Sequence, residues 1–216
     1  IDRVQTRLAD QPITMALERE DGGTQPFVFQ RRHLQRLTGY MISDPSDVVW
    51  LLRLYESLDA GETGFAQYYA ERFFADDDVI TLRAMPTAMD VASGVSAERL
   101  ALFQAEADRS PAGRYLNVPM PQLHGVWPDM DLGEAFRIGP QGDTPVLLLS
   151  GTLDGRTYLE GQAEAVAGLS NVTAITVRNG GHNLFMASPE VGAAITAGLA
   201  GTLVPAEITV KPPEFA

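Results

Sequence analysis

The sequence predicts an α/β fold, in which a mostly parallel sheet is flanked by helices. "VLLLSG", residues 146–151, is a continuous apolar run of the kind that forms buried strands in parallel sheets. "VTAITVRN", residues 172–179, is a second run of strand-forming residues, and a helical pattern follows each run, over residues 158–169 and 188–201. Strands that alternate with helices are typical of a parallel sheet covered on both faces.

The region before these strands is predicted to be mostly helical, with one hairpin. Residues 1–10 suit a helix, and residues 13–30 contain two short strand patterns around a glycine-containing turn. Amphipathic patterns predict helices within residues 31–74 and over residues 96–108, where the opening serine is a suitable N-cap. Residues 111–145 are rich in proline and glycine, which indicates a loop-rich connection.

Apolar side chains at helical spacing predict which helix faces within residues 31–74 are buried. One of these helices is expected to begin at Asp44-Pro45, because proline fits the first helical position. The side chains expected in the core are Leu34, Leu37, Met41, Val48, Leu51, Leu52, Tyr55, Phe65, Tyr68, Tyr69 and Phe73.

Composition excludes several classes of function. The formal net charge of −12 disfavours nucleic-acid binding, which needs clustered lysine and arginine. The chain has no cysteine, so disulfides, cysteine-ligated zinc and thiol catalysis are excluded. No stretch reaches the ~18 apolar residues that a membrane-spanning helix requires, and the histidines lack metal-ligand spacing. We therefore expect no metal, cofactor, membrane segment or nucleic-acid partner.

Two residues at the ends of the predicted strands form the candidate site. Asp154 follows the first strand and His182 the second, and the carboxyl ends of parallel strands are where open α/β sheets place their sites. Gly180 and Gly181 would let the backbone turn sharply before the histidine. An imidazole oriented by a carboxylate is the general-base half of a catalytic triad. We predict a carboxylate oxygen within ~2.6–3.2 Å of a ring nitrogen.

The segments that carry these two residues resemble a known family. "TPVLLLSGTLDGRT" and "RNGGHNLF" are similar to the last two catalytic strands of α/β-hydrolases of the proline iminopeptidase and tripeptidyl-aminopeptidase group. "VWPDMDLGEAFR" and "LVPAEITVKPPEF" also resemble segments of that group. The resemblance implies a mainly helical cap with a short hairpin over residues 1–140, and the C-terminal catalytic portion of the α/β-hydrolase core over residues 141–216. It also implies that Asp154 is the acid of the triad and His182 its base.

The nucleophile of such a triad is absent from the sequence. In the resembled fold the serine lies in a G-x-S-x-G elbow. The two nearest matches, Ser96 and Ser170, have glycine two residues before them but not two residues after. Two predicted strands would also leave open sheet edges, and position 1 is not a methionine. We expect this chain to be a C-terminal piece, with the serine on an N-terminal polypeptide of the same enzyme.

These expectations describe a serine hydrolase, and the resemblance favours an exopeptidase that cleaves near a peptide N-terminus. An esterase or amide hydrolase that acts on a small molecule would use the same acid and base. A non-catalytic binding module, which kept the fold after losing its nucleophile, is the alternative from a different class.

Other polar residues carry weaker expectations. His33, on a helical stripe, and His124, near Trp127, are expected to be structural. The acidic residues Asp76, Asp77 and Asp78 are expected in a solvated loop, with binding of a substrate amine as the alternative. Aminopeptidases of the resembled group hold that amine with carboxylates of the cap. The cap carboxylates left open for this role are Glu18, Glu20, Glu56, Glu62 and Glu71.

Overall fold

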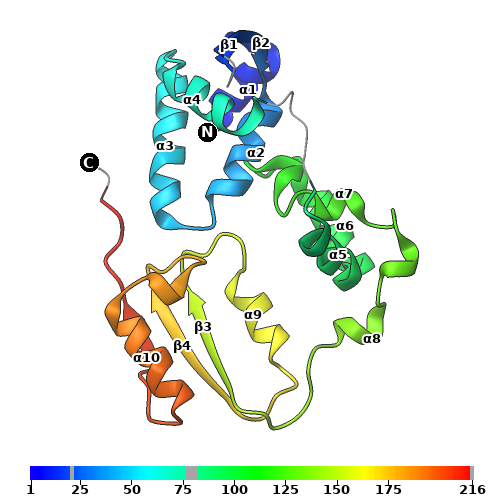
Figure 1. The fold of residues 1–216 in the computed structure, drawn as a ribbon, viewed down its shortest axis with the longest axis vertical. Helices are drawn as coiled ribbons and strands as arrows, with labels where there is room; N and C mark the ends of the chain where they lie inside the picture. The colour runs from blue at the N-terminus through cyan, green and yellow to red at the C-terminus, as the bar shows by residue number, and fades with distance from the viewer. Residues whose placement is uncertain (20–21, 76–81, 215–216) are drawn as a thin grey trace. The chain divides into compact units, whose positions relative to one another are not determined.

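The computed structural model describes residues 1–19, 22–75 and 82–214, and the chain divides into two compact units (Figure 1). Unit 1 comprises Ile1–Tyr40 and Trp50–Gly133, and unit 2 comprises Met41–Val49 and Glu134–Ala216. A short piece of the N-terminal region therefore clusters with the C-terminal region. The assignment of residues 1–140 as a cap and 141–216 as core stays a prediction.

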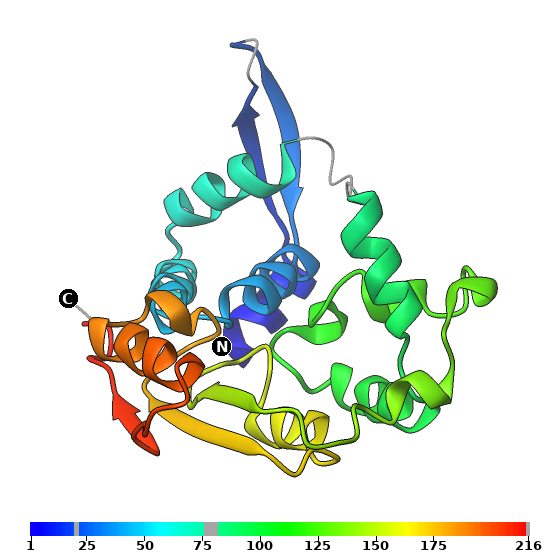
Figure 2. The same ribbon diagram turned by 60° about the horizontal axis from the view of Figure 1, so that its bottom comes forward.

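Unit 1 begins with a helix and the expected hairpin. Helix α1 (Asp2–Asp10) precedes strands β1 (Ile13–Glu18) and β2 (Thr24–Phe29), which pair antiparallel with Ile13 opposite Phe29. Strand β2 starts two residues earlier than the apolar pattern indicated, because Thr24 and Gln25 continue the pairing with β1. Figure 2 shows the hairpin extending away from α1 and the helix that follows it.

Three helices follow the hairpin: α2 (Arg31–Met41), α3 (Pro45–Ala60) and α4 (Gly64–Phe74). Helix α3 begins at Pro45, as predicted. Two core assignments were wrong, because Leu52 and Tyr68 are 38% and 55% exposed. Apolar residues lie on more than one face of α3, so the stripe predicted from the sequence included a residue outside the core. The fully buried side chains of these helices include Leu34, Leu37, Leu54, Leu58 and Phe74.

The rest of unit 1 contains further helices and short helical turns. Helix α5 (Ala84–Ser93) was not predicted, whereas α6 (Ala97–Ala107) was, and the Ser96 hydroxyl caps it by accepting a hydrogen bond from Arg99 N at 3.3 Å. The expected loop-rich connection carries only short helical turns. These are η1 (Gly113–Tyr115), α7 (Met120–Leu123), η2 (Pro128–Met130) and, in unit 2, α8 (Glu134–Arg137).

Unit 2 contains the predicted parallel sheet, with one strand more than expected. Strands β3 (Val146–Gly151), β4 (Val172–Arg178) and β5 (Glu207–Thr209) are all parallel and lie in the order β3-β4-β5. The expectation of two strands was wrong because the C-terminal tail supplies β5. Helix α9 (Leu159–Ala165) is shorter than predicted, and α10 (Pro189–Leu199) is capped by Ser188 as predicted.

The core of unit 2 lies between the sheet and α10. It consists of Ile175, Val177, Leu184, Val191, Ala194 and Val210, with Leu147 and Leu149 packed against it. Gly198 of α10 has no room for a side chain, since a Cβ there would lie 2.7 Å from Leu147 Cδ2. In Figure 1, α10 runs beside β4 and α9 beside β3. Between β4 and α10 the chain forms the short turn η3 (Leu184–Met186).

Strand β3 lies at an edge of the sheet within the described part of the chain. Its four apolar residues, over 146–149, were expected to be buried but are only partly buried. They pair with β4 on one side alone, which explains the incomplete burial. None of the described helices is both long enough and apolar enough to cross a membrane.

Candidate active site

The loop after β3 presents Asp154 in a tight turn. Oδ1 of Asp154 accepts hydrogen bonds from the backbone N–H groups of Arg156 at 2.8 Å and Thr157 at 2.9 Å. An aspartate that binds backbone N–H groups just ahead of itself stabilises a turn. The Asp154 side chain is only 4% exposed. One carboxylate oxygen is thereby fixed by the backbone, and the other is left for a different donor.

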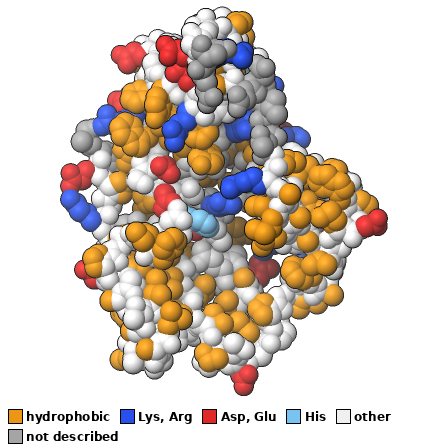
Figure 3. All heavy atoms as spheres, in the orientation of Figure 1, with side chains coloured by type: hydrophobic (Ala, Val, Ile, Leu, Met, Phe, Trp, Pro, Cys, Tyr) orange, Lys and Arg blue, Asp and Glu red, His pale blue; other side chains and the backbone are white. Residues whose placement is uncertain are grey.

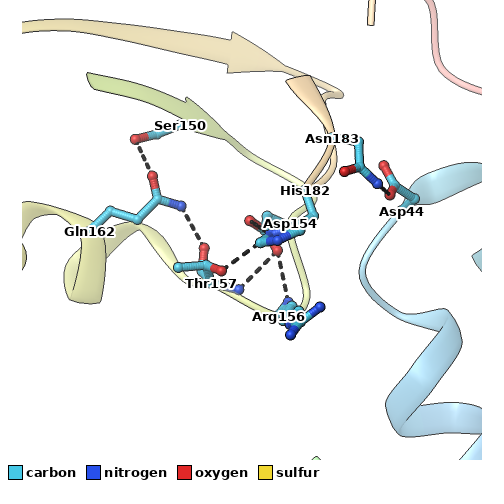
Figure 4. A network of polar contacts seen from close by, with 8 residues as sticks. All are labelled: Asp44, Ser150, Asp154, Arg156, Thr157, Gln162, His182 and Asn183. Carbon is cyan, nitrogen blue, oxygen red and sulfur yellow. Dashed lines mark hydrogen bonds and ion pairs between the residues drawn. The ribbon is translucent and has the colours of Figure 1, made fainter. Parts of the chain in front are cut away.

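That donor is His182, in the loop after β4. Its Nδ1 lies 3.0 Å from Asp154 Oδ2, within the predicted range (Figure 4). Because an ionised carboxylate only accepts hydrogen bonds, Nδ1 carries the proton and donates it. The neutral ring then has an unprotonated Nε2, which is able to accept a proton. The His182 side chain is 35% exposed, so this nitrogen can be reached.

Close contact between the two loops brings these side chains together. Leu153 N donates to Gly180 O at 2.9 Å, and Thr152 N donates to Val177 O at 3.1 Å. Gly151 ends β3 where the loops meet, and a Cβ there would lie 2.5 Å from Gly180 O. A larger residue at this position would force the loops apart. The glycine at position 151 therefore permits the close approach that brings Asp154 and His182 together.

A second group of polar residues supports the same site and was missed from the sequence. Thr157 Oγ1 lies 3.2 Å from His182 Nδ1. Gln162 Nε2 donates to Thr157 O at 2.6 Å, and Ser150 Oγ donates to Gln162 Oε1 at 2.5 Å (Figure 4). This chain of hydrogen bonds links β3 and α9 to the acid loop. The only sequence signal for Thr157 was its place three residues after the aspartate.

Exposed apolar side chains flank both loops. Leu153, directly before Asp154, is 47% exposed, and Phe185 and Met186, on η3 shortly after His182, are 67% and 80% exposed. Figure 3 shows hydrophobic side chains gathered at the surface over η3 and α10. Contiguous apolar surface of this kind commonly marks a contact with a ligand or another protein.

No hydroxyl group of the described residues lies at His182 Nε2. Thr157 contacts the other ring nitrogen, and Ser150 is 9% exposed and bonded to Gln162. The described residues also contain no group of three or more histidine, aspartate or glutamate side chains that could hold a metal ion. The site therefore joins a carboxylate and an imidazole of unit 2, and no hydroxyl of the described residues lies beside the second ring nitrogen.

The remaining candidates lie elsewhere or outside the described residues. His33 is 1% exposed, its Nδ1 accepts a hydrogen bond from Gln30 N at 2.9 Å, and its ring packs against Phe74, as expected of a structural histidine. His124 is exposed. Glu71 accepts hydrogen bonds from Gln67 and from the backbone of Glu18, within unit 1. Glu56 and Glu62 also belong to unit 1, and the candidates outside the described residues are Glu20, Asp76, Asp77 and Asp78.

Comparison with known proteins finds a match to the segment that carries the site. Residues 120–209 match a family model described as TAP-like protein. No curated protein and no solved structure matched the chain. The matched residues include all three strands of the parallel sheet and both loops of the site. The segment that supplies Asp154 and His182 is therefore similar to TAP-like proteins.

Proposed function

We propose that this chain provides the acid and the base of a serine hydrolase that removes residues from a peptide N-terminus. The observation that carries the proposal is the 3.0 Å contact between Asp154 Oδ2 and His182 Nδ1. This contact joins the ends of two neighbouring parallel strands, within the segment that matches the TAP-like family. Acid before histidine along the chain is also the order of the triad in α/β-hydrolases.

The chemistry follows from the tautomer. His182 Nε2 takes the proton of the nucleophilic hydroxyl as that oxygen attacks the substrate carbonyl, and then gives the proton to the leaving amine. Asp154 keeps the proton on Nδ1 and stabilises the imidazolium that forms. The backbone donors at Arg156 and Thr157 hold the carboxylate in place while the ring charge changes.

The nucleophile is proposed to come from an N-terminal polypeptide of the same enzyme, which also extends the sheet at β3. Two observations support this arrangement. The chain has no G-x-S-x-G elbow, and the apolar residues of β3 are only partly buried at a sheet edge. A strand added beside β3 would bury them and use its unpaired backbone groups. With the sheet extended in this way, a serine at the end of a strand of the added polypeptide would lie within about 3 Å of His182 Nε2.

The substrate class rests on the family and on the exposed apolar surface. The matched family model is described as TAP-like protein, and the sequence resembles the tripeptidyl-aminopeptidase group. The proposed substrate is therefore a peptide with a free N-terminal amine. Leu153, Phe185 and Met186 favour apolar side chains beside the scissile bond. A small ester or amide would be attacked by the same residues, and a binding module would attack nothing.

Labelling with a fluorophosphonate probe, which reacts with activated serines, tests the proposal on the complex of this chain with its N-terminal polypeptide. We expect label on a serine of the partner polypeptide and loss of that label in His182→Ala. The exposed His124→Ala serves as the control and keeps the label. Hydrolysis of aminoacyl and tripeptidyl amides should need a free amine. Activity on N-acetylated peptides or on esters alone would favour the small-molecule hydrolase, and absence of labelled serine would favour the binding module.

A further inference from the structure

A segment far from both loops in the sequence contacts each of them through its backbone. Residues 42–44 connect α2 to α3 and belong to unit 2. Gly155 N, directly after the acid Asp154, donates to Ile42 O at 3.2 Å. His182 N donates to Ser43 O at 2.9 Å. Adjacent carbonyl groups of one segment therefore hold the acid loop and the base itself.

A side-chain contact adds to these backbone contacts. Asn183 Nδ2 donates to Asp44 Oδ2 at 2.8 Å, across 139 residues of sequence (Figure 4). A hydrogen bond to a carboxylate is stronger than one between neutral groups. The bond anchors the residue after His182, so the base is held through its own N–H and through its neighbour.

Glycines in both loops make room for the 42–44 segment. A Cβ on Gly155 would lie 2.3 Å from Ile42 O, and a Cβ on Gly181 would lie 2.4 Å from Asp44 Oδ1. Neither glycine has a positive φ angle, so close approach of the segment, and not backbone conformation, requires glycine at these two positions. The two glycines therefore allow the 42–44 segment to lie against the loop of Asp154 and against the loop of His182.

We propose that the 42–44 segment is a positioning element that sets the distance between Asp154 and His182, with Asp44 and Asn183 as positioning residues. On the sheet side, the loops are joined by the bond from Leu153 N to Gly180 O. The His182 ring contacts Asp154 Oδ2 and Thr157 Oγ1 of the other loop, and the 42–44 segment adds backbone contacts to both loops beside this pair. Without the segment, Gly155 N and His182 N would lose these hydrogen bonds. The catalytic consequence of this inference rests on the proposed function, whereas the positioning itself does not.

The first test is structural and uses the chain without any substrate. Asn183→Ala and Asp44→Ala remove the same hydrogen bond, so each should speed amide exchange at His182 and Gly155 by roughly ten- to a hundredfold, the range expected for a bond to a charged group. The double variant should exchange no faster than either single variant. The NMR signal of the Nδ1 proton of His182 should weaken or move as its bond to Asp154 loosens.

Two variants serve as matched controls. Asn171→Ala removes an exposed asparagine at the opposite end of β4, and it should leave both amides and the ring signal unchanged. Asp44→Asn keeps an acceptor oxygen for Asn183, so it should restore most of the protection that Asp44→Ala loses. Unchanged exchange and an unchanged ring signal in Asn183→Ala, at the stability of the wild-type chain, would overturn the positioning role.

The second test separates this inference from the proposed function. In the assembled enzyme, Asn183→Ala should lower kcat by about tenfold or more with little change in KM, since a misplacement of ~1 Å can cost about 10²-fold in rate. If the complex is inactive but the exchange and ring signals change as described, the positioning stands and the proposed function fails. If the complex is active and Asn183→Ala keeps full kcat and unchanged signals, the positioning fails and the function stands.

Discussion

The two units differ in how many large apolar side chains they bury. In unit 1, the helices and the hairpin enclose side chains such as Leu8, Leu17, Phe29 and Leu54, each at most 2% exposed. In unit 2, the sheet packs against α10 over a smaller core, and β3 keeps four partly buried apolar residues at a sheet edge.

The polar groups show the opposite distribution. Unit 1 uses its buried polar groups to hold the fold, since Tyr55 Oη accepts from Gln5 Nε2 at 2.7 Å and lies 2.9 Å from Thr38 Oγ1. Unit 2 pairs the buried carboxylate of Asp154 with the partly exposed ring of His182 through a 3.0 Å contact. The buried polar groups of unit 1 bond to one another, whereas the polar pair of unit 2 has one member that solvent can reach.

The largest expected effect compares the two cores. Leu54→Ala in unit 1 should destabilise its unit by about 2–5 kcal/mol, because a fully buried leucine leaves a cavity. Leu147→Ala, on β3, should cost clearly less in the chain alone, because Leu147 is only partly buried. Thermal and urea unfolding of both variants measure the difference. Equal losses would show that Leu147 is buried as deeply as the core of unit 1, which would contradict the described difference between the two units.

The next effect concerns the buried polar network of unit 1. Tyr55→Phe should cost about 1–3 kcal/mol, because it removes two buried hydrogen bonds, while Gln5 Nε2 keeps its bond to Pro111 O and Thr38 Oγ1 keeps its bond to Leu34 O. Burial is the main cause of the raised pKa of the Tyr55 hydroxyl, so the hydroxyl stays neutral and hydrogen-bonded through neutral pH. Tyr68→Phe removes an exposed hydroxyl and should change the free energy of unfolding by less than about 0.5 kcal/mol.

A smaller effect on the chain itself is expected at the open edge. Leu148→Lys on β3 should change the free energy of unfolding by about 1 kcal/mol or less, since the side chain is already partly exposed and the lysine ammonium can reach solvent. A lysine on an edge strand opposes the addition of another strand. The variant should therefore fold yet fail to bind the N-terminal polypeptide, as measured by co-purification. Normal binding by Leu148→Lys would exclude β3 as the contact.

The smallest expected effect distinguishes two glycines of unit 2. Gly192→Ala, inside α10 with open space around it, should stabilise the chain by about 0.5–1 kcal/mol through helix propensity. Gly181→Ala should do the reverse, because its methyl group meets Asp44 and Pro45. Unfolding curves of the two variants give the sign directly. Stabilisation by Gly181→Ala would mean that the 42–44 segment does not press on the base loop.

Patterns of side chains explain what could be predicted from the sequence. Periodicity identified the hairpin, most helices and strands β3 and β4, and the placement of Asp154 and His182 at the ends of two neighbouring strands predicted the contact that the structure contains. Strand β5 was missed because three residues in a proline-containing tail carry no period, and its pairing is decided by Val177 and its neighbours in β4.

Other features left no readable pattern. The exposure of Leu52 and Tyr68 depends on which of two apolar stripes meets the core, and both stripes look alike in the sequence. The 42–44 segment acts through the carbonyl groups of Ile42 and Ser43, which every residue type possesses. Only the hydrogen bond between Asp44 and Asn183 uses side chains, and 139 residues separate them.

The proposal that the nucleophile lies on another polypeptide is tested most directly by hydrolysis assays. These assays use this chain alone and this chain after addition of the N-terminal polypeptide of the same enzyme. We expect residues 1–216 alone to cleave neither aminoacyl amides nor esters, and the recombined pieces to cleave the amides with strict dependence on His182. A soluble, cooperatively unfolding chain that hydrolyses these substrates without any partner would contradict the proposal that the nucleophile lies on another polypeptide.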